Sequence, residues 1–247
     1  YAWSTDIDIS WCKLGKGNGK VHGGFMKALG LQEGQAWPKN VRKDDEHPVA
    51  YYTIRQKLRD FFRTHPKTKF ILTGHSLGGA LAILFSAVLI LHKESDILER
   101  LEAVYTFGQP MVGNQKFVEF MKGKFKQYSI NYIRAVNYDD LVPRLPFQAL
   151  DYRHFGKMVL YDTNFEQKIV HEDPEENYFA VLSFMKRQLK NAKDAGRSLI
   201  NAFTSGPENR GRWLQRSWRN FKQWLFPGVS AHLSDNYVDR EIPIVEG

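Results

Sequence analysis

The pentapeptide Gly74-His-Ser-Leu-Gly78 constrains this chain more than any other feature of its sequence. It follows Phe70-Ile-Leu-Thr73, a short run of strand-favouring residues, and it leads into Leu77 to Leu91, where apolar residues recur at helical spacing. A serine with glycines two positions before and two positions after it, between a strand and a helix, is typical of a nucleophile elbow. We therefore predict a sharp strand-to-helix turn with Ser76 at its apex.

The residue types in this turn suit nucleophilic chemistry. A serine at the apex has a strained backbone, and the small residues Gly74 and Gly78 leave room for the turn that His75 and Leu77 complete. The amide of Leu77, at the start of the helix, would point to the place where an oxyanion forms, and the helix dipole would assist it. We predict Leu77 as an oxyanion-hole donor.

The remaining pattern predicts an α/β fold. Strands are expected over residues 104–107, 130–136 and 157–161, and a helix over 115–125. Strands that alternate with helices favour a mostly parallel central sheet with helices on both faces. Functional residues in such sheets gather at the carboxyl ends of the strands.

A serine nucleophile needs a histidine base, and the base needs an acid that orients it; in this fold both follow the serine along the chain. Asp139 and Asp140 come just after the strand over 130–136, and either could be the acid or a turn-capping residue. His171 lies in an acidic stretch typical of a surface. The pattern leaves His154 and His232 as candidates for the base, and it favours His232, which lies in a loop after the last predicted helix.

Composition limits the other possibilities. The 247 residues, 43% hydrophobic and 25% charged, are typical of one globular domain over 1–247. The longest apolar run, over 80–91, is shorter than the ~20 residues that a membrane-spanning helix needs. Cys12 is the only cysteine, which favours a reducing compartment. No metal-ligand spacing or phosphate-binding glycine loop occurs, so we expect no metal and no cofactor.

The net charge of +8 belongs to one segment. Between Phe184 and Phe226 lie ten Lys or Arg residues and two acids, an excess equal to the whole net charge. The pattern predicts a basic helical insertion over 183–226, in which Leu214, Trp218, Phe221 and Leu225 share one face with Trp213 and Trp224 beside them, and Arg212, Arg216 and Arg219 lie opposite. This is typical of a helix at a lipid interface, although a helix packed on the domain would also fit. No nucleic-acid reading motif accompanies the charge, so we expect no nucleic-acid partner.

Several segments together resemble the class 3 lipases, and more closely their plant oil-body branch. The matching segments, in family order along nearly the whole chain, are Trp-Ser-Thr-Asp-Ile-Asp-Ile (3–9), Val-His-Gly-Gly-Phe (21–25), Gly-His-Ser-Leu-Gly-Gly-Ala-Leu-Ala (74–82), Tyr-Thr-Phe-Gly-Gln-Pro (105–110), Asn-Tyr-Asp-Asp-Leu-Val-Pro-Arg-Leu-Pro (137–146) and Ser-Ala-His-Leu-Ser-Asp-Asn-Tyr-Val (230–238). One departure is Met111, where such proteins often have Arg. The resemblance implies an α/β-hydrolase fold and a catalytic triad of Ser76, Asp140 and His232, and it selects Asp140 over Asp139 and His232 over His154.

The resemblance also implies a function. It implies a triacylglycerol lipase that releases fatty acids at a lipid–water interface, inside the cell, on a lipid droplet or membrane surface. The alternatives are an sn-1 phospholipase or galactolipase of the same fold, and a non-catalytic protein that binds lipid droplets. In the family the second oxyanion donor and most of the lid precede the segment that matches residues 3–9. We therefore expect the sequence, which begins at Tyr1, to be an N-terminally truncated chain and a poor catalyst by itself.

Overall fold

The computed structural model describes residues 10–31, 49–146, 151–161 and 167–170, together with His232 and Tyr237. The predicted helical insertion over 183–226, with its possible interface residues Trp213, Trp218, Phe221 and Trp224, lies outside the described residues. His171 lies outside them as well.

A five-stranded sheet forms the centre of the described part. Its strands, in spatial order, are β3 (Phe70–His75), β4 (Leu101–Phe107), β6 (Asn131–Asn137), β8 (Lys157–Tyr161) and β9 (Gln167–Val170). The first four are parallel, and β9 is antiparallel to β8. The carboxyl ends of β3, β4 and β6 therefore meet at one edge of the sheet. The prediction of an α/β fold with a mostly parallel central sheet is confirmed.

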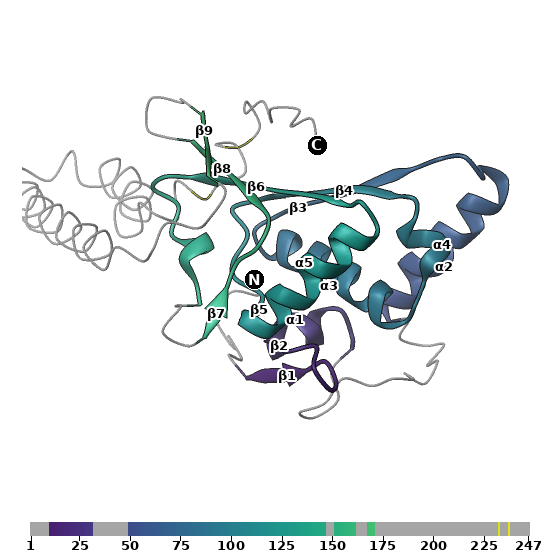
Figure 1. Ribbon diagram of the computed structural model, residues 1–247, viewed down its shortest axis with the longest axis horizontal. Coiled ribbons are helices and arrows are strands. Elements are labelled where there is room, and N and C mark those ends of the chain that lie inside the picture. Colours follow the sequence, from purple (N-terminus) through teal and green to yellow (C-terminus); the bar gives the residue numbers. More distant parts are fainter. Residues whose placement is uncertain are drawn as a thin grey trace, which may run out of the picture.

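The helices pack against this sheet and against one another. They are α1 (Gly23–Ala28), α2 (Ala50–Thr64), α3 (Leu77–Leu91), α4 (Ser95–Leu98) and α5 (Gln115–Gln127), with a short 3₁₀ turn, η1, over Val142–Arg144. Helix α3 lies beneath β3 and β4 (Figure 1) and contacts α1 and α4 as well. It is apolar on nearly all sides, and eleven of its residues are buried. A helix surrounded by protein in this way needs no polar face.

A second, smaller sheet was not predicted from the sequence. Its antiparallel strands, in spatial order, are β1 (Trp11–Lys13), β2 (Lys20–His22), β5 (Gly113–Asn114) and β7 (Tyr152–Arg153). Figure 1 shows β1 and β2 on the opposite side of α1 and α5 from the large sheet. Strands of two or three residues are too short to show the alternation by which strands are recognised.

Apolar side chains fill both faces of the large sheet. The main core lies around α3 and includes Ile83, Leu84 and Val104, all fully buried. A smaller cluster covers the other face at β6 and β8 and contains Ile133, Val159, Tyr161 and Tyr237. Tyr237 comes from a distant part of the chain, and its hydroxyl lies at Asn137, the last residue of β6. Within the described residues, no helix is long and apolar enough to cross a membrane.

Candidate active site

Ser76 occupies the predicted elbow. Strand β3 ends at His75 and α3 begins at Leu77, so Ser76 is the single residue between them. Its backbone has φ 56° and ψ −127°, a conformation that non-glycine residues rarely adopt and that costs about 1–3 kcal/mol. The amide of Ser76 donates to the carbonyl oxygen of Phe107 at 2.8 Å. This bond ties the strained residue to the end of β4.

The two glycines of the motif act differently. A Cβ on Gly74 would lie 2.4 Å from the carbonyl carbon and oxygen of Gly78, so the backbone of Gly78 occupies the space that a side chain at position 74 would need. A Cβ on Gly78 would meet nothing within 4 Å. On the helix side, the next residue, Gly79, has less room for a side chain than Gly78, because a Cβ on Gly79 would lie 3.0 Å from the carbonyl oxygen of Gly74. The expectation that both motif glycines make room for the turn holds for Gly74, whereas Gly78 contributes its backbone.

Asp140 follows β6 and is fully buried. Its amide donates to the carbonyl oxygen of Asn137 at 3.0 Å, and its Oδ1 accepts from the amide of Val142 at 2.9 Å. The neighbouring Asp139 is half-buried. A buried carboxylate held by a backbone amide on one oxygen has its other oxygen available for a second partner.

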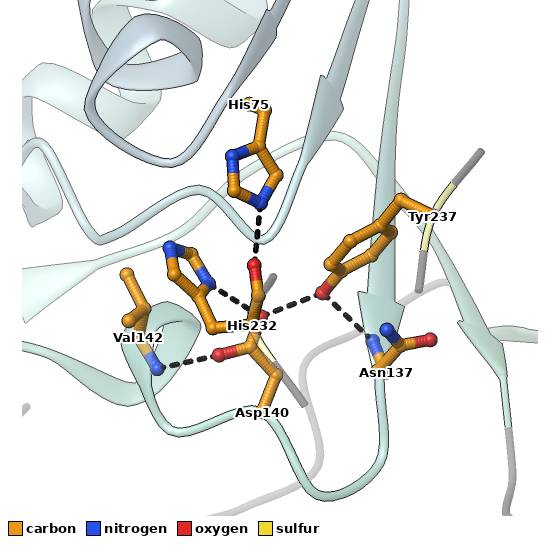
Figure 2. A network of polar contacts seen from close by, with 6 residues as sticks. All are labelled: His75, Asn137, Asp140, Val142, His232 and Tyr237. Atoms are coloured by element: carbon orange, nitrogen blue, oxygen red, sulfur yellow. Dashed lines mark hydrogen bonds and ion pairs between the residues drawn. The ribbon is translucent and has the colours of Figure 1, made fainter. Parts of the chain in front are cut away.

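That second partner is His232. Its Nδ1 lies 2.8 Å from Oδ2 of Asp140, and both side chains are buried (Figure 2). Because the carboxylate accepts, Nδ1 carries the hydrogen and Nε2 keeps a lone pair that can take a proton. His154, the other candidate, binds instead through Nε2 to the carbonyl oxygen of Pro143 at 2.7 Å. The structure therefore joins Asp140 to His232, 92 positions later in the sequence.

The two atoms that would exchange a proton share one property. Both Oγ of Ser76 and Nε2 of His232 are buried and have no hydrogen-bond partner among the described residues. Buried polar atoms without partners are rare in proteins and cluster at functional sites. The imidazole of His75, which precedes Ser76, has its ring centre 4.6 Å from that of His232. Ser76 and His232 thus lie at the same edge of the sheet.

Gly108 lets the chain pass beside the Asp140–His232 pair. It directly follows β4 and has φ +57°, in the left-handed region that favours glycine. A Cβ there would lie 2.7 Å from Oδ2 of Asp140 and 2.9 Å from Nδ1 of His232. Any side chain at position 108 would enter the space of the hydrogen bond itself.

Leu77 occupies the position predicted for the oxyanion donor. It is the first residue of α3, and the first amides of a helix have no acceptor within the helix. The carbonyl oxygen of Ser76 already accepts from the amides of Gly79 and Ala80, at 3.0 and 3.3 Å. This arrangement fixes the start of the helix directly beside Ser76.

Tyr237 is a site residue that the sequence did not reveal. Its hydroxyl donates to Oδ2 of Asp140 at 2.6 Å and accepts from the amide of Asn137 at 3.2 Å (Figure 2). Its position in the family-like segment 230–238 was a signal, but nothing in the spacing connects a tyrosine to a carboxylate 97 positions earlier.

The sequence predicts no role for His75 beyond its place in the elbow. The structure places it half-buried, with Nε2 2.7 Å from the carbonyl oxygen of His232. Burial lowers the pKa of His75 below its ordinary value, and the nearby His232 adds to this effect, whereas the hydrogen bond to the His232 carbonyl and Asp140 oppose it. Among the described residues, no three His, Cys, Asp or Glu side chains are arranged to hold a metal ion.

Comparisons with known proteins show the family of this chain. The family model for lipase (class 3) matches residues 1–150. The triacylglycerol lipase OBL1 of Arabidopsis thaliana is 34% identical over 256 residues, which cover 96% of this chain and 49% of that protein. The chain thus spans about half the length of this relative.

Two solved structures resemble the fold. A lipase from Rhizopus microsporus var. chinensis superposes with a TM-score of 0.53 at 27% identity, covering 68% of this chain and 51% of its own. A triacylglycerol lipase whose catalytic centre is described as a serine protease triad superposes with a TM-score of 0.50 at 28% identity, covering 67% of this chain and 55% of its own. With its elbow serine, its buried Asp–His pair and these relatives, the chain belongs to the class 3 lipase family of α/β-hydrolases.

Proposed function

We propose that this protein hydrolyses carboxylic esters of lipids with Ser76 as nucleophile, His232 as general base and Asp140 as the acid that orients the base. The observation that carries the proposal is the 2.8 Å bond between Nδ1 of His232 and Oδ2 of Asp140, beside a serine in a strained elbow. A structural role for the pair would not account for Nε2 of His232 and Oγ of Ser76, which both lack a hydrogen-bond partner in the part of the chain that the structure describes.

The mechanism follows from these positions. His232 takes the proton of Ser76 through Nε2, and Oγ attacks the ester carbonyl carbon. The negative charge that develops on the carbonyl oxygen is stabilised by the amide of Leu77. His232 then protonates the leaving alcohol, and a water molecule activated in the same way releases the fatty acid. Asp140 keeps the hydrogen on Nδ1 and stabilises the imidazolium.

Triacylglycerol is the proposed substrate. Relatives from Arabidopsis thaliana, Nicotiana tabacum and Ricinus communis that match 96% of this chain are named triacylglycerol lipases. The same site could accept the sn-1 ester of a phospholipid or galactolipid. Release of fatty acid from triacylglycerol, diacylglycerol and phosphatidylcholine, compared at equal interfacial area, separates these substrates. Faster release from phosphatidylcholine would reject the triacylglycerol assignment.

A lipid droplet or membrane surface is the proposed place of action, reached through the basic segment over 183–226. Attraction between its ten Lys and Arg residues and anionic head groups would add to insertion of Trp213, Trp218, Phe221 and Trp224. Replacement of Arg212, Arg216 and Arg219 by Glu is expected to weaken binding to anionic vesicles at least tenfold. Unchanged binding would remove this part of the proposal.

The catalytic proposal is tested by replacing the nucleophile. Ser76→Ala is expected to abolish both hydrolysis of a soluble ester and covalent labelling by a fluorophosphonate. Ser95→Ala, at the start of α4 and beyond the opposite end of α3 from Ser76, serves as the matched control and should retain both. Labelling that persists in Ser76→Ala would contradict the assignment. Full-length protein that binds lipid droplets but is neither active nor labelled would favour the non-catalytic alternative.

A further inference from the structure

We propose that His75 is a positioning residue of this reaction, which holds the backbone of His232 so that the imidazole of His232 stays aligned between Asp140 and Ser76. The inference rests on the proposed function and adds to it a residue outside the triad.

The geometry gives His75 a defined role as a donor. Its Nε2 lies 2.7 Å from the carbonyl oxygen of His232, and a carbonyl can only accept, so Nε2 of His75 carries the hydrogen (Figure 2). The bond joins residues 157 positions apart. The donor residue, His75, directly precedes Ser76 in the chain. The bond therefore links the end of β3, next to Ser76, to the backbone of His232.

The hydrogen bond from His75 restricts a motion of His232 that its bond to Asp140 alone would allow. The side chain of His232 is held at Nδ1 by Asp140, and a ring held at one atom can still tilt as its backbone shifts. The bond from His75 fixes the backbone at the same residue. Proton transfer requires Nε2 of His232 to stay within hydrogen-bond reach of Oγ of Ser76, and a misplacement of ~1 Å can cost ~10²-fold in rate.

The electrostatics of His75 suit a neighbour of the base. Among the described residues, the groups that face its imidazole are His232, Asp140 and the ring of Tyr237, whose centre is 5.5 Å away. His232 becomes an imidazolium during the reaction, and a second cation at this distance would oppose that change. Burial lowers the pKa of His75 and so favours its neutral form, which donates a hydrogen without adding charge.

Three substitutions at position 75 distinguish the effect of the hydrogen-bond donor from the effect of the aromatic ring. His75→Gln places an amide near the position of Nε2 and keeps the donor. His75→Asn places its amide near the position of Nδ1, too short to reach the carbonyl. His75→Phe keeps the ring and its contacts with His232 and Tyr237 but removes the donor. All three are compared with wild-type protein on a soluble ester and for the rate of fluorophosphonate labelling of Ser76.

We expect His75→Phe and His75→Asn to lose about tenfold in kcat with little change in KM, and His75→Gln to recover most of that loss. Labelling rates should follow the same order. The melting temperature of His75→Phe shows whether this variant folds. If it does not, the comparison of kcat between His75→Gln and His75→Asn tests the inference. Equal activity of Gln and Asn, or full activity of Phe, would overturn the inference. Full-length protein that is inactive and unlabelled would instead defeat the proposed function.

Discussion

The phenolic hydroxyl of Tyr237 lies 2.6 Å from Oδ2 of Asp140, the same oxygen that accepts from Nδ1 of His232. Together with the amide of Val142 on Oδ1, this gives the fully buried carboxylate three donors. A buried charge is tolerated when its acceptor positions are filled in this way. Tyr237 is therefore one of the three donors that hold this carboxylate in place.

Tyr237→Phe removes one of these donors without changing the ring. A hydrogen bond to a charged group contributes about 1.5–3 kcal/mol, so we expect the free energy of unfolding to fall by about that amount and kcat to fall about tenfold. The aromatic contacts of Tyr237 with His75 and Phe107 should persist, because the ring remains. Urea unfolding and ester hydrolysis measure the two effects.

Tyr105→Phe is the matched control, since Tyr105 is half-buried and packs against the same cluster on the sheet. It should leave kcat unchanged. Tyr237→Phe protein with the same kcat and stability as Tyr105→Phe would show that the third donor has no part in holding Asp140.

The second prediction concerns the glycine beside the pair. Gly108→Ala places a Cβ within 3 Å of both Asp140 and His232, and it forces alanine into a left-handed conformation that costs about 1–2 kcal/mol. We expect kcat to fall at least ~10²-fold, because the two side chains must separate. Ester hydrolysis by folded protein, verified by circular dichroism, is the measurement.

Gly123→Ala is the corresponding control. Gly123 lies inside α5, and a Cβ there would meet nothing within 4 Å. Alanine in a helix interior is more stable than glycine by about 0.5–1 kcal/mol. We expect unchanged kcat and a higher melting temperature. An equal loss of activity in both variants would mean that the effect of Gly108→Ala is not local.

The sequence predicted the elbow because all its parts are adjacent in the chain. The predicted helix over Leu77–Leu91 has the observed bounds, and the strand expected over 157–161 does too. The strand expected over 104–107 begins earlier, at Leu101, because Glu102 interrupts the apolar run. Local pattern was sufficient to predict those helices and strands whose own apolar residues recur at helical or strand spacing.

The rest of the site depends on contacts between distant residues. Pattern alone kept Asp139 open beside Asp140, and only the resemblance selected Asp140, which is the one that His232 contacts. Nothing local connects Tyr237 to Asp140, Gly108 to His232, or His75 to the His232 carbonyl, since these pairs form only when the sheet brings strand ends together. Such pairings follow from topology, which the sequence pattern describes only coarsely.

A third prediction concerns pH and Cys12. This thiol is fully buried in β1 opposite Val21, and burial raises its pKa from 9.0 to about 11. Between these values the unfolded chain loses the thiol proton while the folded protein keeps it, so stability falls as pH rises. The stabilising contribution is complete below the unfolded pKa and is lost as pH rises through the folded pKa.

Comparison with Cys12→Ala isolates this effect from other titrations. The stability advantage of wild-type protein over Cys12→Ala, measured by urea unfolding, should shrink by up to about 2 kcal/mol between about pH 8 and about pH 11. A constant difference across this range would contradict the raised pKa. Below about pH 9, folded protein should also resist alkylation of its thiol, because only the thiolate reacts.

The last prediction separates the two glycines of the elbow. In Gly74→Ala the new methyl group would meet the backbone of Gly78 at 2.4 Å, and backbone atoms cannot move aside as a flexible side chain can. The elbow must then open, which displaces Ser76 and the amide of Leu77 together. We expect loss of fluorophosphonate labelling and a destabilisation of several kcal/mol, in the range of severe single substitutions.

Gly78→Ala introduces a methyl group of the same size two residues after the serine, where nothing lies within 4 Å. Since position 78 is in the first turn of α3 and alanine favours helix, the variant should fold with at least wild-type stability and keep its reaction with the fluorophosphonate. Each variant thus adds one methyl group, at one of the two glycine positions that the motif treats as equivalent. Equal damage by both would mean that the room above Gly78 is needed for the reacting groups, and equal tolerance would mean that the turn at Gly74 can relax.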